Sequence, residues 1–154
     1  MVNRKIWVVS IMRGVIVPDP NSCSGCGGCE LVCSLFHEGE CNPTLARIHV
    51  SREVFTGENT PEVCKQCPCP ECLSACPVEA IKIDEKTGAR VIVEEDCTGC
   101  EKCMAACLFN EKKTVLRFDP EKNVVIKCDL CGGEPQCVKV CPHGALKYVK
   151  IGEA

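Results

Sequence analysis

The stretch Cys23-Ser-Gly-Cys26-Gly-Gly-Cys29-Glu-Leu-Val-Cys33 holds four cysteines separated by two, two and three residues. The first three are close enough on the chain for one tight loop to bring their thiols to three corners of a [4Fe–4S] cubane, and the glycines permit the turns that this loop needs. The fourth cysteine lies one helical turn further on and points away from the loop. It is therefore expected to ligate a neighbouring cluster.

Three further groups of cysteines follow the same plan, and we call the four groups motifs I to IV in chain order. Motif I is Cys23, Cys26, Cys29 and Cys33, motif II is Cys64, Cys67, Cys72 and Cys76, motif III is Cys97, Cys100, Cys103 and Cys107, and motif IV is Cys128, Cys131, Cys137 and Cys141. A proline follows the last cysteine of motifs II and IV and is expected to close a short helix there. Ser34 and Leu108 stand at this position in motifs I and III, so we expect the helices of those two motifs to run further.

Zinc sites and disulfides are the alternative uses of so many cysteines. A zinc site takes four ligands from two Cys-x2-Cys pairs and does not need a third cysteine three residues after the second. In motifs II and IV the spacings are longer, so the argument against zinc is weaker for these two motifs. Arg4 and Lys5 precede a short apolar run without a cleavage site. We therefore expect a cytoplasmic chain with reduced thiols, which argues against disulfides and predicts four [4Fe–4S] clusters as cofactors.

Composition limits the fold and the partners. Aromatic residues make up only 4% of the 154 residues, so a core without metal would be thin, and we expect one small domain over residues 1–154. The formal charge of −3 falls to about −11 when four oxidised clusters are bound. We expect no nucleic-acid partner and no direct membrane insertion.

The segments between the motifs indicate how the motifs pair. A strand, a turn containing Gly88 and a second strand separate motif II from motif III, as in a two-cluster ferredoxin. This predicts an inner module over residues 55–110, with motifs I and IV pairing across it in an outer module over 12–54 plus 111–154. Strands are expected at 15–17, 114–118, 124–127 and 145–151. Sequential pairing, I with II and III with IV, is the alternative and would bridge the 30 residues between Cys33 and Cys64.

The predicted fold class is thus α+β, with two ferredoxin-like modules of short helices and β-hairpins in a nested arrangement. Nesting gives four ligand sets, each named after the motif that supplies three of its members. Set I is Cys23, Cys26, Cys29 and Cys141, set II is Cys64, Cys67, Cys72 and Cys107, set III is Cys97, Cys100, Cys103 and Cys76, and set IV is Cys128, Cys131, Cys137 and Cys33. Cys69 competes with Cys72, which we prefer because of its spacing to Cys76. Cys41 is expected to be a buried or interface thiol.

This layout resembles the iron–sulfur electron-transfer subunits of multi-subunit oxidoreductases, such as the beta subunits of formate dehydrogenases and the four-cluster subunit of dimethyl sulfoxide reductase-type enzymes. The stretch Cys29-Glu-Leu-Val-Cys33-Ser-Leu-Phe-His37-Glu-Gly39, with Asn42-Pro43 and Ala46-Arg47-Ile48 after it, resembles the small subunits that accompany tungsten enzymes of the aldehyde:ferredoxin oxidoreductase family, which include aldehyde oxidoreductases and the benzoyl-coenzyme A reductase of strict anaerobes. The resemblance implies a large catalytic partner subunit with a tungsten or molybdenum pterin and a further redox protein.

Nothing in the sequence indicates catalysis by the chain itself, since it has no nucleophile–base pair, phosphate-binding loop or flavin fingerprint. The histidines have structural interpretations: His37 ends a helix, His49 lies on the exposed face of a strand, and His143 lies in a turn. A subunit of a hydrogenase or carbon monoxide dehydrogenase and a free polyferredoxin remain alternative functions. A zinc-stapled interaction module is the least favoured.

Overall fold

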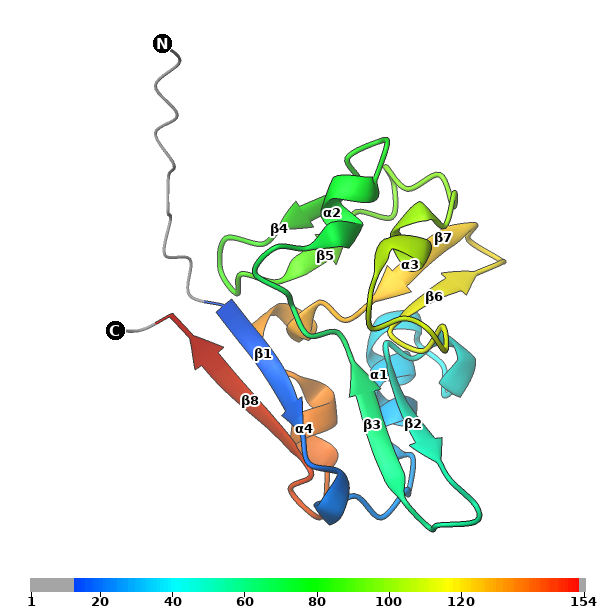
Figure 1. The fold of residues 1–154 in the computed structure, drawn as a ribbon, viewed down its shortest axis with the longest axis vertical. Helices are drawn as coiled ribbons and strands as arrows, with labels where there is room; N and C mark the ends of the chain where they lie inside the picture. The colour runs from blue at the N-terminus through cyan, green and yellow to red at the C-terminus, as the bar shows by residue number, and fades with distance from the viewer. Residues whose placement is uncertain (1–12, 153–154) are drawn as a thin grey trace.

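The computed structural model describes residues 13–152, so the apolar run near the N-terminus lies outside the described residues. Short helices alternate with short strands (Figure 1). Their order is β1 (Arg13–Pro18), α1 (Gly28–Glu38), β2 (Ile48–Arg52), β3 (Asn59–Val63), α2 (Glu71–Ala75), β4 (Ile81–Ile83), β5 (Arg90–Ile92), α3 (Lys102–Ala106), β6 (Leu116–Asp119), β7 (Val124–Lys127), α4 (Gln136–Val140) and β8 (Leu146–Ile151). The predicted class, an α+β chain of short helices and hairpins, is confirmed.

The described strands form four separate antiparallel pairs. β2 pairs with β3, β4 with β5, and β6 with β7, each as a local hairpin. β1 pairs with β8, with Val15 opposite Val149, and so brings the two ends of the described chain together. The strands expected near residues 15, 116, 125 and 148 are therefore present.

The helices of the four motifs also form two pairs. α1 of motif I packs against α4 of motif IV, and α2 of motif II packs against α3 of motif III. In Figure 1, α2 and α3 lie in the upper half of the molecule and α4 lies in the lower half, beside β1 and β8. Motifs that are far apart in sequence are thus neighbours in space.

Cysteines make up part of the core. One contiguous group of buried side chains joins aliphatic residues such as Ile16, Ile48 and Leu116 to motif cysteines. The buried motif cysteines are Cys33, Cys64, Cys72, Cys103, Cys128 and Cys137. A group bound by these sulfurs would therefore contact the interior of the fold as well as its surface.

The C-terminal ends of α1 and α3 test the expectation that a helix without a proline after its last motif cysteine runs further. α1 continues past Cys33 to Glu38, as predicted, but α3 ends at Ala106, so the prediction that the motif III helix runs further was wrong. The Asn110 side chain explains the stop. Its Nδ2 donates to the Met104 carbonyl at 3.3 Å, and its Oδ1 accepts from the Leu116 backbone N–H at 2.9 Å. The chain is thereby turned from the helix directly into β6.

Strand β3 was not among the predicted strands, and it contains Pro61, which has no backbone donor and is disfavoured inside a sheet. The strand forms at a sheet edge, where Pro61 lies opposite Val50 of β2. Two-stranded sheets consist only of edges, so the missing donor of Pro61 can face away from the partner strand.

Glu30 in the first turn of α1 joins this helix to β2. Its carboxylate is buried and accepts from the Val50 backbone N–H at 3.0 Å and from Arg52 Nη2 at 3.0 Å, and its Oε1 lies 2.9 Å from His49 Nδ1. His49 lies on the less buried face of β2, between the buried Ile48 and Val50, as the alternation in the sequence predicts, and its ring lies beside the Glu30 carboxylate there. These contacts hold the motif I helix against the β2–β3 hairpin.

We expect Glu30→Ala to destabilise the fold by about 1–3 kcal/mol, because the buried Val50 N–H would lose its acceptor. The measurement is the apparent unfolding temperature of anaerobic holoprotein, followed by far-UV circular dichroism. Glu134→Ala is the matched control, since Glu134 pairs with Lys139 in solvent. Equal unfolding temperatures for the two variants would contradict the role given to Glu30.

Candidate functional site

One backbone turn recurs in all four motifs. The residue before the second cysteine has a left-handed conformation in each, with φ of +73° at Gly25, +48° at Gln66, +70° at Gly99 and +60° at Leu130. Glycine adopts this conformation freely, whereas Gln66 and Leu130 adopt it at a cost of about 1–2 kcal/mol. The sequence indicated the turn only in motifs I and III, where glycine stands at this position.

The structure brings each predicted set of cysteines together. Three recesses are each lined by one complete set: Cys23, Cys26, Cys29 and Cys141 in the first, Cys64, Cys67, Cys72 and Cys107 in the second, and Cys76, Cys97, Cys100 and Cys103 in the third. In the remaining set, Cys137 lies close enough to Cys33 and Cys131 for their charges to act on it, and Cys128 lies within the same range of Cys137. Each group combines three cysteines of one motif with the last cysteine of another.

The last cysteine of every motif accepts a hydrogen bond from the backbone. The N–H groups of Arg47, Ala80 and Ala145 lie 3.2, 3.3 and 3.3 Å from the sulfurs of Cys33, Cys76 and Cys141. A backbone hydrogen bond from Phe109 reaches Cys107. An N–H donated to sulfur stabilises a thiolate, so each of these cysteines is prepared to act as an anionic ligand.

Burial works in the opposite direction. Desolvation, reinforced by neighbouring acidic groups, raises the pKa of Cys29 and of Cys137 to about 12 and that of Cys103 to about 11. Burial also raises the pKa of Cys128 far above its ordinary value. Thiolates at these positions need a positively charged partner, which a bound metal group supplies. The chemistry of the four sets, each with four converging thiols, fits such a group.

The sets follow one another in a single order. Cys103 of set III lies within electrostatic range of Cys72 of set II, Cys128 of set IV within range of Cys64 of set II, and Cys137 of set IV within range of Cys29 of set I. The four sets therefore form a row in the order III, II, IV, I.

Gln66 joins the middle two sets of this row. It is fully buried, and its backbone N–H lies 3.4 Å from Cys64 Sγ. Its side-chain Nε2 donates to the Cys128 carbonyl at 2.9 Å, and its Oε1 accepts from the Arg90 backbone N–H at 2.8 Å. This contact between motif II and motif IV gave no signal in the sequence.

A network of charged side chains also connects distant segments. Arg47, from the Ala46-Arg47-Ile48 stretch singled out in the sequence, pairs with Glu38 of α1 at 3.3 Å and with Glu94 before motif III at 3.2 Å. Lys122 pairs with the same two carboxylates. The Arg47 backbone N–H also donates to Cys33 Sγ. The network therefore holds the C-terminal end of α1 in place relative to the segment before motif III.

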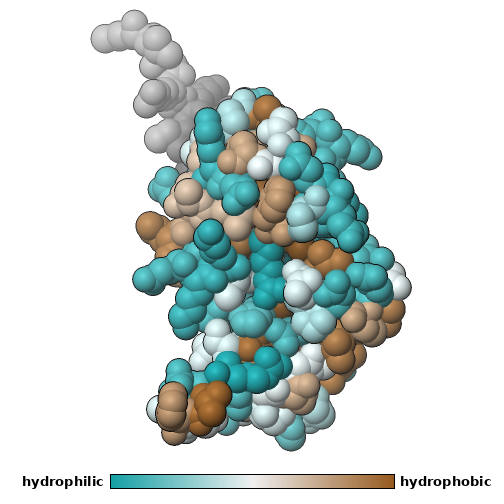
Figure 2. All heavy atoms as spheres, turned by 90° about the vertical axis from the view of Figure 1, so that its right-hand side faces the viewer, coloured by the Kyte–Doolittle hydropathy of each residue, from teal (hydrophilic) through white to brown (hydrophobic). Residues whose placement is uncertain are grey.

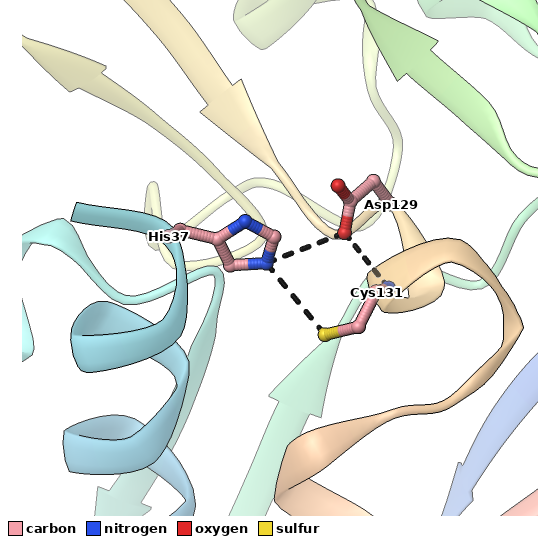
Figure 3. A group of neighbouring side chains, drawn as sticks. All are labelled: His37, Asp129 and Cys131. Carbon is pink, nitrogen blue, oxygen red and sulfur yellow. Dashed lines mark hydrogen bonds and ion pairs between the residues drawn. The ribbon is translucent and has the colours of Figure 1, made fainter. Parts of the chain in front are cut away.

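His37 lies in the last turn of α1, as expected, and its side chain also reaches motif IV. Its Nε2 lies 3.3 Å from Asp129 Oδ1 and 3.7 Å from Cys131 Sγ (Figure 3). Burial opposes protonation, but the hydrogen bonds to Asp129 and Cys131 outweigh it and raise the pKa of His37 to about 9. The spacing of four residues from Cys33 was the signal in the sequence, because it places both side chains on one helix face. His143 is exposed at the edge of the set I recess.

The two cysteines outside the motifs are both exposed. Cys72 is buried among set II, whereas Cys69 lies at the open side of the same recess. This agrees with the preference for Cys72. Cys41 is exposed, so the buried alternative is wrong for this chain.

The surface between these sites is mixed in character. Large apolar side chains are exposed on α1, at Leu31, Leu35 and Phe36, and beyond motif III at Leu108. Figure 2 shows the hydrophobic residues of one face in separate groups among hydrophilic ones. In the part of the chain that the structure describes, the helices are all too short or too polar to cross a membrane.

Two families match the chain. Residues 55–151 match the family described as 4Fe-4S dicluster domain, and residues 20–35 match the one described as 4Fe-4S binding domain. Between them, the two matched segments contain all four motifs. These matches support iron–sulfur clusters as the metal groups of this chain and favour them over zinc ions and disulfides.

Relatives match this sequence over most of the chain. The polyferredoxin-like subunit of aliphatic sulfonate oxidoreductase from Pyrococcus furiosus is 46% identical over 151 residues, with 96% of this chain and 80% of the relative covered. The iron–sulfur subunit of the nitrate-inducible formate dehydrogenase of Escherichia coli is 33% identical over 156 residues, with 84% of this chain and 52% of the relative covered.

A solved structure also matches. A chain of the active site complex BamBC of benzoyl coenzyme A reductase, in complex with benzoyl-CoA, superposes with a TM-score of 0.52 at 26% identity, and the match covers 90% of this chain and 80% of that chain. The predicted resemblance to iron–sulfur electron-transfer subunits of oxidoreductases is confirmed by these comparisons. The chain belongs to the 4Fe-4S dicluster domain family.

Proposed function

We propose that the chain is a non-catalytic electron-transfer subunit that holds four [4Fe–4S] clusters within a larger oxidoreductase. The observation that carries this proposal is the convergence of sixteen cysteines into four sets of four. Four soft thiolate donors in each set suit an iron–sulfur cluster, which supplies a site that takes up and releases one electron.

The proposed iron ligands are sets I to IV as the motifs define them. Sets II and III make up the inner module, residues 55–110, and sets I and IV the outer module, residues 12–54 plus 111–154. The modules are joined by Gln66 and by the β2–β3 hairpin, whose strands lie on either side of residue 55.

The row of sets suits a relay with an entrance and an exit. Cys100 of set III and Cys26 of set I are exposed, and these are the two sets at the ends of the row. The middle sets contain the buried Cys64, Cys72, Cys128 and Cys137. Each end set therefore has an exposed cysteine at which a partner could approach, whereas most of the buried motif cysteines lie in the middle sets.

The partners we propose follow from the relatives. Those relatives are subunits named for an aliphatic sulfonate oxidoreductase, a formate dehydrogenase and a benzoyl coenzyme A reductase. We assign to one end of the row a large catalytic subunit of the aldehyde:ferredoxin oxidoreductase family with a tungsten or molybdenum pterin. A further redox protein binds at the other end, and the complex works in the cytoplasm.

Anaerobic purification from the native source tests this function. We expect about 16 iron and as much acid-labile sulfide per chain, together with a large subunit that contains a pterin. Four zinc ions without sulfide would contradict the proposal. Purification with a hydrogenase or a carbon monoxide dehydrogenase, or as a free monomer, would keep the relay and exclude the pterin partner.

Removal of the metal is expected to unfold the chain. Six motif cysteines lie in the core. Without iron, no bonds would connect these cysteines to one another across the core. Treatment of the holoprotein with a chelator and a mild oxidant should abolish the far-UV circular dichroism of the folded state together with the visible absorbance. A folded spectrum after complete loss of iron would contradict this expectation.

Pairs of cysteine substitutions test the ligand sets. Cys26→Ala with Cys141→Ala removes two ligands of set I only, so about 12 iron should remain. Cys131→Ala with Cys141→Ala removes one ligand each from sets IV and I, so about 8 should remain. The measurement is iron content per chain after anaerobic purification.

The opposite order of iron contents would show that Cys141 serves its own motif. Cys41→Ala and Cys69→Ala are the controls for general damage by cysteine substitution. Both are exposed and lie outside the proposed sets, so each should retain about 16 iron.

A further inference from the structure

Two side chains of α1, Cys33 and His37, lie beside cysteines of motif IV. Cys33 and His37 are four residues apart on α1 and therefore share a face of the helix. Cys33 belongs to set IV through its neighbour Cys137, and His37 reaches Cys131 of the same set. The imidazole points from α1 toward the motif IV loop, and its side chain is only 10% exposed (Figure 3).

Asp129 completes a closed group of three. Its Oδ1 accepts the Cys131 backbone N–H at 2.9 Å and lies 3.3 Å from His37 Nε2. The Asp129 carboxylate thus holds the turn in which Leu130 and Cys131 have φ of +60° and +49°. His37 contacts both the group that fixes this turn and the sulfur that the turn presents.

This side-chain contact distinguishes set IV. Within residues 13–152, His37 is the one side chain in hydrogen-bonding range of a motif cysteine sulfur, while the other hydrogen bonds to these sulfurs come from backbone N–H groups. The backbone donors recur from motif to motif, as at Ala80 and Ala145. The His37 contact has no counterpart among the other sets.

We propose that His37 is a positioning residue for set IV, which donates Nε2–H to Cys131 Sγ, holds Asp129 in place and selectively raises the reduction potential of the centre bound there. The inference rests on the proposed iron–sulfur function. A hydrogen bond to a thiolate sulfur is strengthened as negative charge on the centre increases, so it favours the reduced state.

The test is a redox titration of the anaerobic full-length chain followed by electron paramagnetic resonance. In His37→Phe, which keeps an aromatic ring but has no donor, the midpoint potential of one of the four centres should shift to a more negative value. His37→Gln restores an N–H donor and should recover part of this shift. Adding Cys131→Ala to His37→Phe removes the shifted centre and thereby identifies it as set IV.

Lys139→Gln is the matched control, because it removes a positive charge from motif IV without removing a contact to a motif cysteine. Lys139 pairs with Glu134 at 2.8 Å and is half-exposed, so its loss should leave all four potentials unchanged. No shift in His37→Phe, or an equal shift of all four centres, would overturn the proposal while leaving the relay intact.

Iron content separates the remaining outcomes. It should stay at about 16 in both His37 variants, because His37 is not a ligand in this proposal. Loss of about 4 iron in both variants would make His37 a ligand and overturn the inference. Absence of iron–sulfur centres in the unaltered chain would instead refute the proposed function.

Discussion

The structure depends on the binding of thiolates in its interior. Burial, together with neighbouring negative groups, raises the pKa of Cys29 and Cys137 to about 12, so these thiols would not ionise near neutral pH without a compensating positive group. Iron–sulfur clusters supply that compensation, and bound thiols would link segments that are distant in sequence. We therefore expect cofactor binding and folding to be coupled in this chain.

The nested pairing that we propose links this local requirement to the overall architecture. Each motif loop gathers three thiols, while its last cysteine, held by a backbone N–H, lies beside the loop of another motif. The pairing of β1 with β8 and of α1 with α4 brings motif I beside motif IV, as the proposed outer module requires. Gln66 then connects the two modules at the middle of the row, and the ends of the row reach the surface.

Much of this follows from the sequence, because cysteine spacing and glycine or proline at fixed positions act locally. The motifs, most strands and the proline-terminated helices could be predicted in this way. The end of α3 at Asn110, strand β3 with its Pro61, and the roles of Gln66 and His37 could not, because each depends on a partner distant in sequence. The ligand sets stay a prediction, since proximity of thiols does not by itself prove a shared cluster.

A crystal structure of the anaerobic holoprotein, with anomalous data collected at the iron edge, tests the central claim most directly. The account predicts four iron–sulfur centres in a row, each bound by three cysteines of one motif and by the last cysteine of its partner motif. Centres bound by four cysteines of a single motif, or single metal ions in place of clusters, would contradict it.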